Sequence, residues 1–207
     1  MAEIKLTKNE LKDQRYKLSQ LQRYLPTLQL KKALLQIEVT GATMEIEELL
    51  VFFQRKKEQN ESFQALLTDR EATHLFDGTS IIDVEKRIEN IAGTDIPQFE
   101  RVVFAPFAYS LFDTPLWIDD AIYSLRELLI IKEKIKVVEE KKRILDKELR
   151  DVSIRVNLFE KVMIPRIKEN IKKIRVFLGD QQLAAVAQAK VAKGKILKRK
   201  MEMVEIQ

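Results

Sequence analysis

Residues 128–163 read LLIIKEKIKVVEEKKRILDKELRDVSIRVNLFEKVM. Apolar side chains recur in this stretch at alternating steps of three and four, and only Lys142 interrupts the series. The series consists of Leu128, Ile131, Ile135, Val138, Leu145, Leu149, Val152, Val156, Phe159 and Met163. A strict heptad of this kind places one apolar stripe along a helix and favours a left-handed supercoil with a partner helix.

A second stripe of the same period begins at Leu11, and thirteen of its eighteen a and d positions through Arg70 are apolar. Its expected seam residues are Leu18, Leu21, Leu25, Leu28, Leu35, Ile46, Leu49 and Phe53. Thr7 and Glu10 form a capping box, so we expect a helix from there to about Phe76. Pro26 interrupts this helix and predicts a kink or a break, and a kink is favoured because the heptad stays in phase.

Most of the turn-forming residues lie between the two stripes. Gly78, Gly93, Pro97, Pro106 and Pro115 all fall there, which places the reversal of the chain in the middle. The flanking segments 84–91 and 94–104 are rich in Ile, Val and Phe around Ala92 and Gly93, and they predict a β-hairpin.

The predicted fold class is therefore mainly α. We expect a long antiparallel two-helix left-handed coiled coil with a short central β-hairpin region. An ordinary helical bundle is the alternative, because it also buries amphipathic faces. It requires more helices of similar length than this chain has residues for.

Four segments are expected. They are a first long helix (1–76), a central hairpin and loop region (77–114), a second long helix (115–178) and a basic helical or frayed tail (179–207). Beyond Met163 the apolar spacing takes an extra step of four near Pro165, which predicts local unwinding of the coiled coil. Gly179 and Asp180 predict a further break.

The sequence contains no arrangement that supports catalysis or cofactor binding. His74 is the only histidine, and no cysteine is present, so His pairs and thiolate metal sites are excluded. Gly194 and Lys195 resemble the end of a phosphate loop, but Ile196 stands where Ser or Thr is needed and Ala189 where Gly is needed. We therefore expect no catalytic, cofactor-binding or metal residues, no cofactor, and no enzyme activity of the chain by itself.

Composition also restricts the location of the protein. The absence of cysteine fits a reducing compartment. The N-terminus lacks the apolar core of a signal peptide, and the longest apolar run, residues 49–53, is too short to span a bilayer. These features predict a cytoplasmic protein without direct membrane insertion.

The formal charge of +5 arises mostly in the tail. Six basic residues stand there without an acidic neighbour: Lys190, Lys193, Lys195, Lys198, Arg199 and Lys200. Such a segment suits nucleic acid, an anionic membrane or an acidic protein surface. A solvated, frayed helix end is the simpler interpretation.

Several short motifs resemble a known family along essentially the whole chain. They are TKNEL (7–11), LKKALL (30–35), IENIAG (88–93) followed by Ile96 and Pro97, RVNLFE (155–160) and VMIPRI (162–167). With the paired long helices and the central hairpin, they are similar to the D subunits of the V-type and A-type rotary ATPases, which form the shaft of the central rotor. Pro26 and a less basic first helix depart from the family pattern.

The resemblance implies a non-catalytic central-stalk subunit that transmits torque between an ATP-hydrolysing or ATP-synthesising head and a membrane ion-translocating ring. The implied partners are the hexameric head of A and B subunits, the F subunit, and the ring-coupling C/d subunit, without nucleic acid. The protein would then be peripheral to the membrane, with its basic tail as a candidate head contact.

Two other interpretations remain open. The first is a prefoldin-like helical adaptor or chaperone, although prefoldin chains are shorter and lack the Ile-Pro-Arg motif found here at residues 164–166. The second is a nucleic-acid or membrane-surface binder that acts through the basic tail. Binding that collapses with salt and disappears when the residues after Gly179 are removed would support the second interpretation.

Overall fold

The computed structural model of the chain describes residues 4–63, 73–108 and 117–204, and the side chains of residues 62–63, 73–74 and 199–204 lie outside that description. Its internal contacts divide the chain into two compact units. The central unit comprises Leu30–Ser153, and the terminal unit comprises Met1–Gln29 with Ile154–Gln207.

The first long helix, α1, spans Lys8–Gln59. Thr7 caps it, because its Oγ1 accepts a hydrogen bond of 3.2 Å from the backbone N–H of Glu10. The helix continues through Pro26 without a break. It ends earlier than the expected Phe76, and a short 3-10 helix, η1 (Asn60–Phe63), follows. Asn is a poor helix former because its side chain offers the backbone other hydrogen bonds, so Asn60 disfavours a further α-helical turn.

The second long helical stretch consists of three consecutive elements. They are α3 (Ile118–Asn157), a π-helical turn η4 (Leu158–Met163) and α4 (Ile164–Val204). The expected helix start at Thr114 and Pro115 lies outside the described residues. The expected break at Gly179 and Asp180 was wrong, because α4 runs through both positions. One glycine costs a helix only about 1 kcal/mol, and the Ala-rich sequence that follows favours helix.

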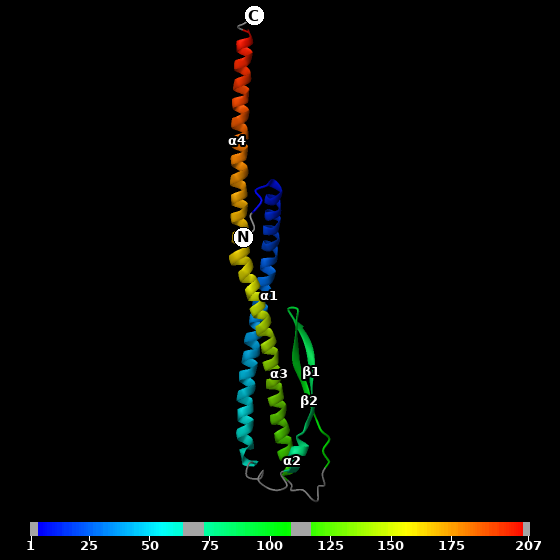
Figure 1. Cartoon of the computed structure of the whole chain (residues 1–207). Coiled ribbons are helices and arrows are strands. Elements are labelled where there is room, and N and C mark those ends of the chain that lie inside the picture. Colours follow the sequence, from blue (N-terminus) through cyan, green and yellow to red (C-terminus); the bar gives the residue numbers. More distant parts are fainter. Residues whose placement is uncertain (1–3, 64–72, 109–116, 205–207) are drawn as a thin grey trace. The chain divides into compact units, whose positions relative to one another are not determined.

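In the central unit, α1 and α3 pack against each other in antiparallel directions (Figure 1). The interhelical ion pairs establish the direction, since Lys31, Glu45 and Lys56 of α1 pair with Glu148, Lys141 and Glu127 of α3. Leu35 and Ala42 of α1 are buried, as are Ile131, Ile135, Val138 and Leu145 of α3. The expected pair of long packed helices is confirmed.

The predicted hairpin is also confirmed. It is formed by β1 (Ile81–Ile91) and β2 (Thr94–Phe104), which pair antiparallel. Ala92 and Gly93 form the turn with φ angles of 52° and 78°, as a tight type I′ turn requires. Pro97 lies opposite Ile88 in a two-stranded sheet, where every strand is an edge.

The hairpin lies beside α3 (Figure 1), where Lys86 of β1 forms an ion pair with Glu140 of α3. Val137 is buried and lies one turn before Glu140 on the same helix face. Ile96 of β2 is fully buried. A two-stranded sheet is marginal in water by itself, and the helix supplies the apolar surface it needs.

A small apolar cluster joins the hairpin to the helices. Leu75 of α2 (Thr73–Gly78) packs with Ile118, Ala121 and Ile122 of α3. Arg126 of α3 donates a hydrogen bond of 2.8 Å to the carbonyl oxygen of Gly78. Its guanidinium also lies 5.0 Å from the centre of the Phe104 ring, so the cluster links α2, β2 and α3.

Candidate functional site

The candidate functional features of the described residues are packing seams and exposed surfaces. No group of three or more His, Cys, Asp or Glu side chains among them is placed to hold a metal ion. The lowered pKa values of Glu85, Glu140 and Glu169 arise first from hydrogen bonds donated by Arg101, Lys86 and Lys173 on the surface. Within the described ranges, no helix is long and apolar enough to cross a membrane.

The sixteen expected seam residues are all at least partly covered. The buried ones are Leu35, Ile135, Val138, Leu145, Val152 and Val156. The half-buried ones are Leu18, Leu21, Leu25, Leu28, Ile46, Leu49, Phe53, Leu149, Phe159 and Met163. In a pair of helices without a surrounding layer, half-burial is the usual state of a seam side chain whose rim faces water.

A charged residue in the seam is accommodated by pairing. Lys56 occupies a d position, and its Nζ lies 2.9 Å from Oε2 of Glu127 on the facing helix. The same ammonium group lies 5.9 Å from the centre of the Phe52 ring. The lysine stem can thus cover apolar surface while the charge remains neutralised.

The π-helical turn η4 changes the seam of the terminal unit. The buried apolar positions here are Val156, Ile164, Ile167, Ile171 and Ile174, and Phe159 and Met163 are half-buried beside the turn. The step from Phe159 to Ile164 is five, and the backbone N–H of Ile164 donates to the carbonyl oxygen of Phe159, also five residues back. The wide turn absorbs one extra residue, so the steps of three and four resume without rotating the stripe.

A second apolar stripe on α1 of the central unit is exposed among the described residues. Leu30, Leu34, Ile37, Met44 and Val51 are all exposed, Ile37 by 66%. They follow steps of three and four when Gly41 and Glu48 are included. Apart from the neighbouring backbone of α1 itself, no described atom would lie within 4 Å of a Cβ at Gly41. We call these five residues the α1 stripe. Exposed apolar surface at heptad spacing is typical of a helix-binding face.

The two units differ in charge. The terminal unit has 19 Lys and Arg against 8 Asp and Glu, a net charge of +11. The central unit has 18 basic against 24 acidic residues, a net charge of −6. The small overall charge of +5 is therefore the sum of two units with opposite net charge. Each unit should attract partners of opposite sign.

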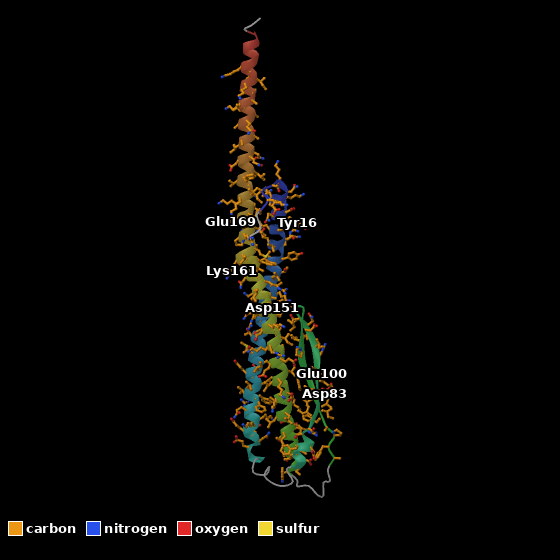
Figure 2. All side chains as sticks on the ribbon, in the orientation of Figure 1. Tyr16, Asp83, Glu100, Asp151, Lys161 and Glu169 are labelled. Carbon is orange, nitrogen blue, oxygen red and sulfur yellow. The ribbon has the colours of Figure 1, made fainter. Side chains whose placement is uncertain are left out.

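Four cations of the terminal unit gather around one groove. Arg15 of α1 and Lys168, Lys172 and Arg175 of α4 line it, and its volume is about 420 Å³. Leu18, Ile171 and Val176 add apolar groups to the lining, and Ser19 and Gln22 add polar ones. No acidic side chain contributes to it, and none of the four cations has an ion pair within the described part of the chain. Tyr16 and Glu169, labelled in Figure 2, mark the two helices on which these cations lie.

The basic tail is helical, because α4 extends to Val204. Lys190, Lys193, Lys195 and Lys198 are exposed, whereas the side chains of Arg199 and Lys200 lie outside the described residues. At about 100° per residue, the six positions are spread around the helix and do not share one face. A partner surface that surrounds the helix can contact all six positions, whereas a flat surface can contact only some of them.

Sequence reasoning missed three of these features. The α1 stripe could have been found, because its spacing is visible once α1 is known to carry two apolar faces. The cationic groove required the register between α1 and α4, which no local pattern provides. The π-helical turn was indicated only by the shifted spacing near Pro165.

Comparison with known proteins agrees with the family resemblance noted in the sequence. The profile of the family described as the ATP synthase D subunit matches residues 10–194. The V-type ATP synthase D subunit of Chlamydia caviae is 45% identical over 202 residues, which cover 97% of each chain. The corresponding protein of Chlamydia muridarum is 44% identical over 200 residues, covering 96% of this chain and 98% of the relative.

Proposed function

The chain belongs to the family of ATP synthase D subunits, and from that premise we propose how its two units carry torque and bind their partners. It is a non-catalytic, central-stalk subunit of a V-type rotary ATP synthase. We propose that it transmits torque between the nucleotide-binding head and the membrane ion-translocating ring. Its contacts with partners are inferred from the charge, packing and exposure of the described residues.

The observation that carries this proposal is the interlocked pairing of the helices. In the central unit, buried apolar residues alternate with the ion pairs Lys31–Glu148 and Lys56–Glu127 along α1 and α3. Close-packed side chains resist sliding because they leave no free space between the helices. A torque applied to one helix is therefore passed to the other. The expected seam residues are proposed to serve this coupling.

The charges of the two units support a partner arrangement that the family resemblance implies. We propose that the terminal unit, with its net charge of +11, enters the central cavity of the head formed by the A and B subunits. The basic tail, residues 190–200, would be its bearing contact, because its cations surround the helix. The central unit would face the F subunit and the ring-coupling subunit.

Rotation inside the head can be tested by reversible locking. The chain has no cysteine, so a cysteine introduced at the exposed Val186 of α4 is unique. We expect a disulfide between V186C and a cysteine in the cavity wall of the head to stop ATP hydrolysis. Reduction should restore it. Full hydrolysis with the disulfide intact would contradict the proposal, and V186C without a cysteine in the head is the control.

The α1 stripe is proposed to be the contact for the F subunit. Its five apolar residues are exposed in the central unit, and Glu47 and Glu48 lie beside Val51. Gly41 leaves room for the backbone of a partner helix to approach closely. A helix with apolar residues at heptad spacing and basic flanks would fit this surface.

A charge placed in the stripe tests this assignment. Ile37→Asp should weaken binding of the purified F subunit by about 100-fold, because it buries an unpaired carboxylate in the contact. It should leave the thermal unfolding of the isolated chain unchanged, since Ile37 is 66% exposed. Ile82→Asp on the hairpin, where Ile82 is 64% exposed, is the matched control. Equal affinity of both variants for the F subunit would remove the stripe from the interface.

A further inference from the structure

We propose that the groove lined by Arg15, Lys168, Lys172 and Arg175 is a docking site for an acidic segment of the head. This inference rests on the proposed function, because it assumes that the terminal unit lies inside the head. It assigns binding of the head to a specific site on the terminal unit, in addition to the attraction that its net charge provides.

The first argument is the absence of neutralisation. Seven Lys and Arg side chains of the described residues form an ion pair, as Lys173 does with Glu169 in the same helix. The four groove cations have none among the described residues, although they converge from α1 and α4 on one hollow. Like charges held together repel each other, and a bound anion removes that repulsion. The arrangement is therefore more favourable with carboxylates in the groove than without them.

The second argument identifies the occupant as protein. Leu18, Ile171 and Val176 contribute apolar surface to the same groove. The phosphate backbone of a nucleic acid is polar and does not pack against apolar side chains. A planar membrane cannot enter a groove between two helices. A peptide segment with Asp or Glu beside an apolar side chain satisfies both parts of the lining. Arg15 and Arg175 can each hold a carboxylate with two parallel hydrogen bonds.

The groove also has a consequence for rotation. It is on one side of the terminal unit and includes residues of both α1 and α4, so it presents its charge in one direction. A head with several equivalent acidic segments would engage the groove with one of them at a time. The docking site would therefore move from one head subunit to the next as the shaft turns.

The test compares two variants with equal loss of charge. The groove variant combines Arg15→Gln, Lys168→Gln, Lys172→Gln and Arg175→Gln. The control variant combines Lys8→Gln, Lys12→Gln, Arg23→Gln and Lys161→Gln, all exposed positions of the same unit that do not line this groove. Circular dichroism verifies that both remain helical.

The readout is the affinity for a purified head assembled from A and B subunits, measured over a range of salt concentrations. We expect the groove variant to bind at least about tenfold more weakly at low salt and with a flatter salt dependence, while the control variant stays within about threefold of the unmodified chain. Equal affinity of the two variants would overturn the inference and leave the shaft function intact. Failure of the unmodified chain to bind the head would instead overturn the proposed function.

A second measurement identifies the chemistry of the occupant. A carbodiimide that joins amines to touching carboxylates should link Nζ of Lys168 or Lys172 to an Asp or Glu of a head subunit, as mapped by mass spectrometry. Links from Lys8 and Lys12 at equal yield would contradict a specific site. Loss of oligonucleotide binding in the groove variant, with head affinity unchanged, would also overturn the proposal in favour of a nucleic-acid site.

Discussion

Lys86 of β1 donates a hydrogen bond to Glu140 of α3, with 2.7 Å between Nζ and Oε2. The two residues are 54 positions apart in the sequence, and their contact attaches the hairpin to the second long helix. The pKa of Glu140 lies below its usual range, first because of this hydrogen bond and then because of the positive charge of Lys86. The contact is therefore sensitive to both mutation and pH.

Removing this ion pair should loosen the hairpin without unfolding the chain. Both side chains are about 40% exposed, and such pairs contribute about 1 kcal/mol or less to stability. We expect Glu140→Gln to increase hydrogen exchange in β1 and β2 several-fold and to leave exchange in α1 unchanged. Glu139→Gln, at the exposed neighbouring position, is the control. Identical exchange in the two variants would show that apolar packing alone holds the hairpin.

Acid should have the same effect as Glu140→Gln. Because the pKa of Glu140 is lower in the folded state, its contribution to stability is complete above the unfolded pKa of a glutamate. That contribution is lost as the pH falls through the lowered value. The opening of the hairpin, measured as the exchange rate divided by the intrinsic amide rate at the same pH, should therefore increase below about pH 4.3 in the unmodified chain. In Glu140→Gln the rise should be absent.

The turn of the hairpin contains a strained residue. Ala92 has a φ of 52°, in a region that costs a non-glycine residue about 1–2 kcal/mol. Ala92→Gly should therefore raise the free energy of unfolding by about 1 kcal/mol, because the removed strain exceeds the added chain entropy. Gly93→Ala should lower it, since Gly93 has a φ of 78°. Denaturant unfolding of both variants measures the difference, and a loss of stability in Ala92→Gly would disprove the strain.

Gly78 has a different role, which depends on space. A Cβ at this position would lie 2.9 Å from Cδ1 of the buried Ile122 and 3.2 Å from the Phe107 ring. We expect Gly78→Ala to destabilise the chain by about 1 kcal/mol through overpacking. Gly41→Ala is the matched control, because nothing lies within 4 Å there and the helix should gain about 1 kcal/mol. Thermal unfolding should thus shift in opposite directions for the two substitutions.

The sequence allowed the paired helices and the hairpin to be predicted for a physical reason. Apolar side chains at steps of three and four can be buried only along one helix face, so residues 128–163 indicate a partner helix without any tertiary information. Ala92 and Gly93 likewise mark the hairpin locally. The end of α1 at Gln59 was not predicted, because the heptad continues formally beyond it.

The surfaces were harder to predict than the fold. The cationic groove combines Arg15 with Lys168, and their proximity depends on the register of two helices that are distant in sequence. Continuity of α4 through Gly179 was also missed, because a single glycine was given more weight than the helix formers around it. Local patterns identify which faces are buried, whereas register decides which exposed residues meet.

The central seam can be broken selectively. Leu145 is fully buried and Leu149 is half-buried on the same face of α3. Replacing both with Asp should separate the helices of the central unit and uncouple ATP hydrolysis from ion pumping, because neither carboxylate has a partner there. Asp substitutions at the exposed Tyr123 and Ile154 serve as the control. Full ATP-driven pumping with the seam variant would count against the seam as the torque path.

The π-helical turn provides the sharpest test of the seam in the terminal unit. Deleting the exposed Glu160 from η4 removes the residue that the wide turn absorbs, so Ile164, Ile167 and Ile171 can stay in the seam of a regular α-helix. Pro165 should then clash with the preceding turn and cost about 3 kcal/mol. Adding Pro165→Ala to the deletion should restore most of that loss in denaturant unfolding.

The control is a deletion where no wide turn exists. Removing the exposed Lys132 from α3 should rotate the following residues by about 100°. Ile135, Val138 and Leu145 would then leave their buried positions. The stability of this variant should fall by more than about 3 kcal/mol, and Pro165→Ala should not restore it. Equal losses from the two deletions, with no restoration in either, would mean that the turn does not absorb the extra residue.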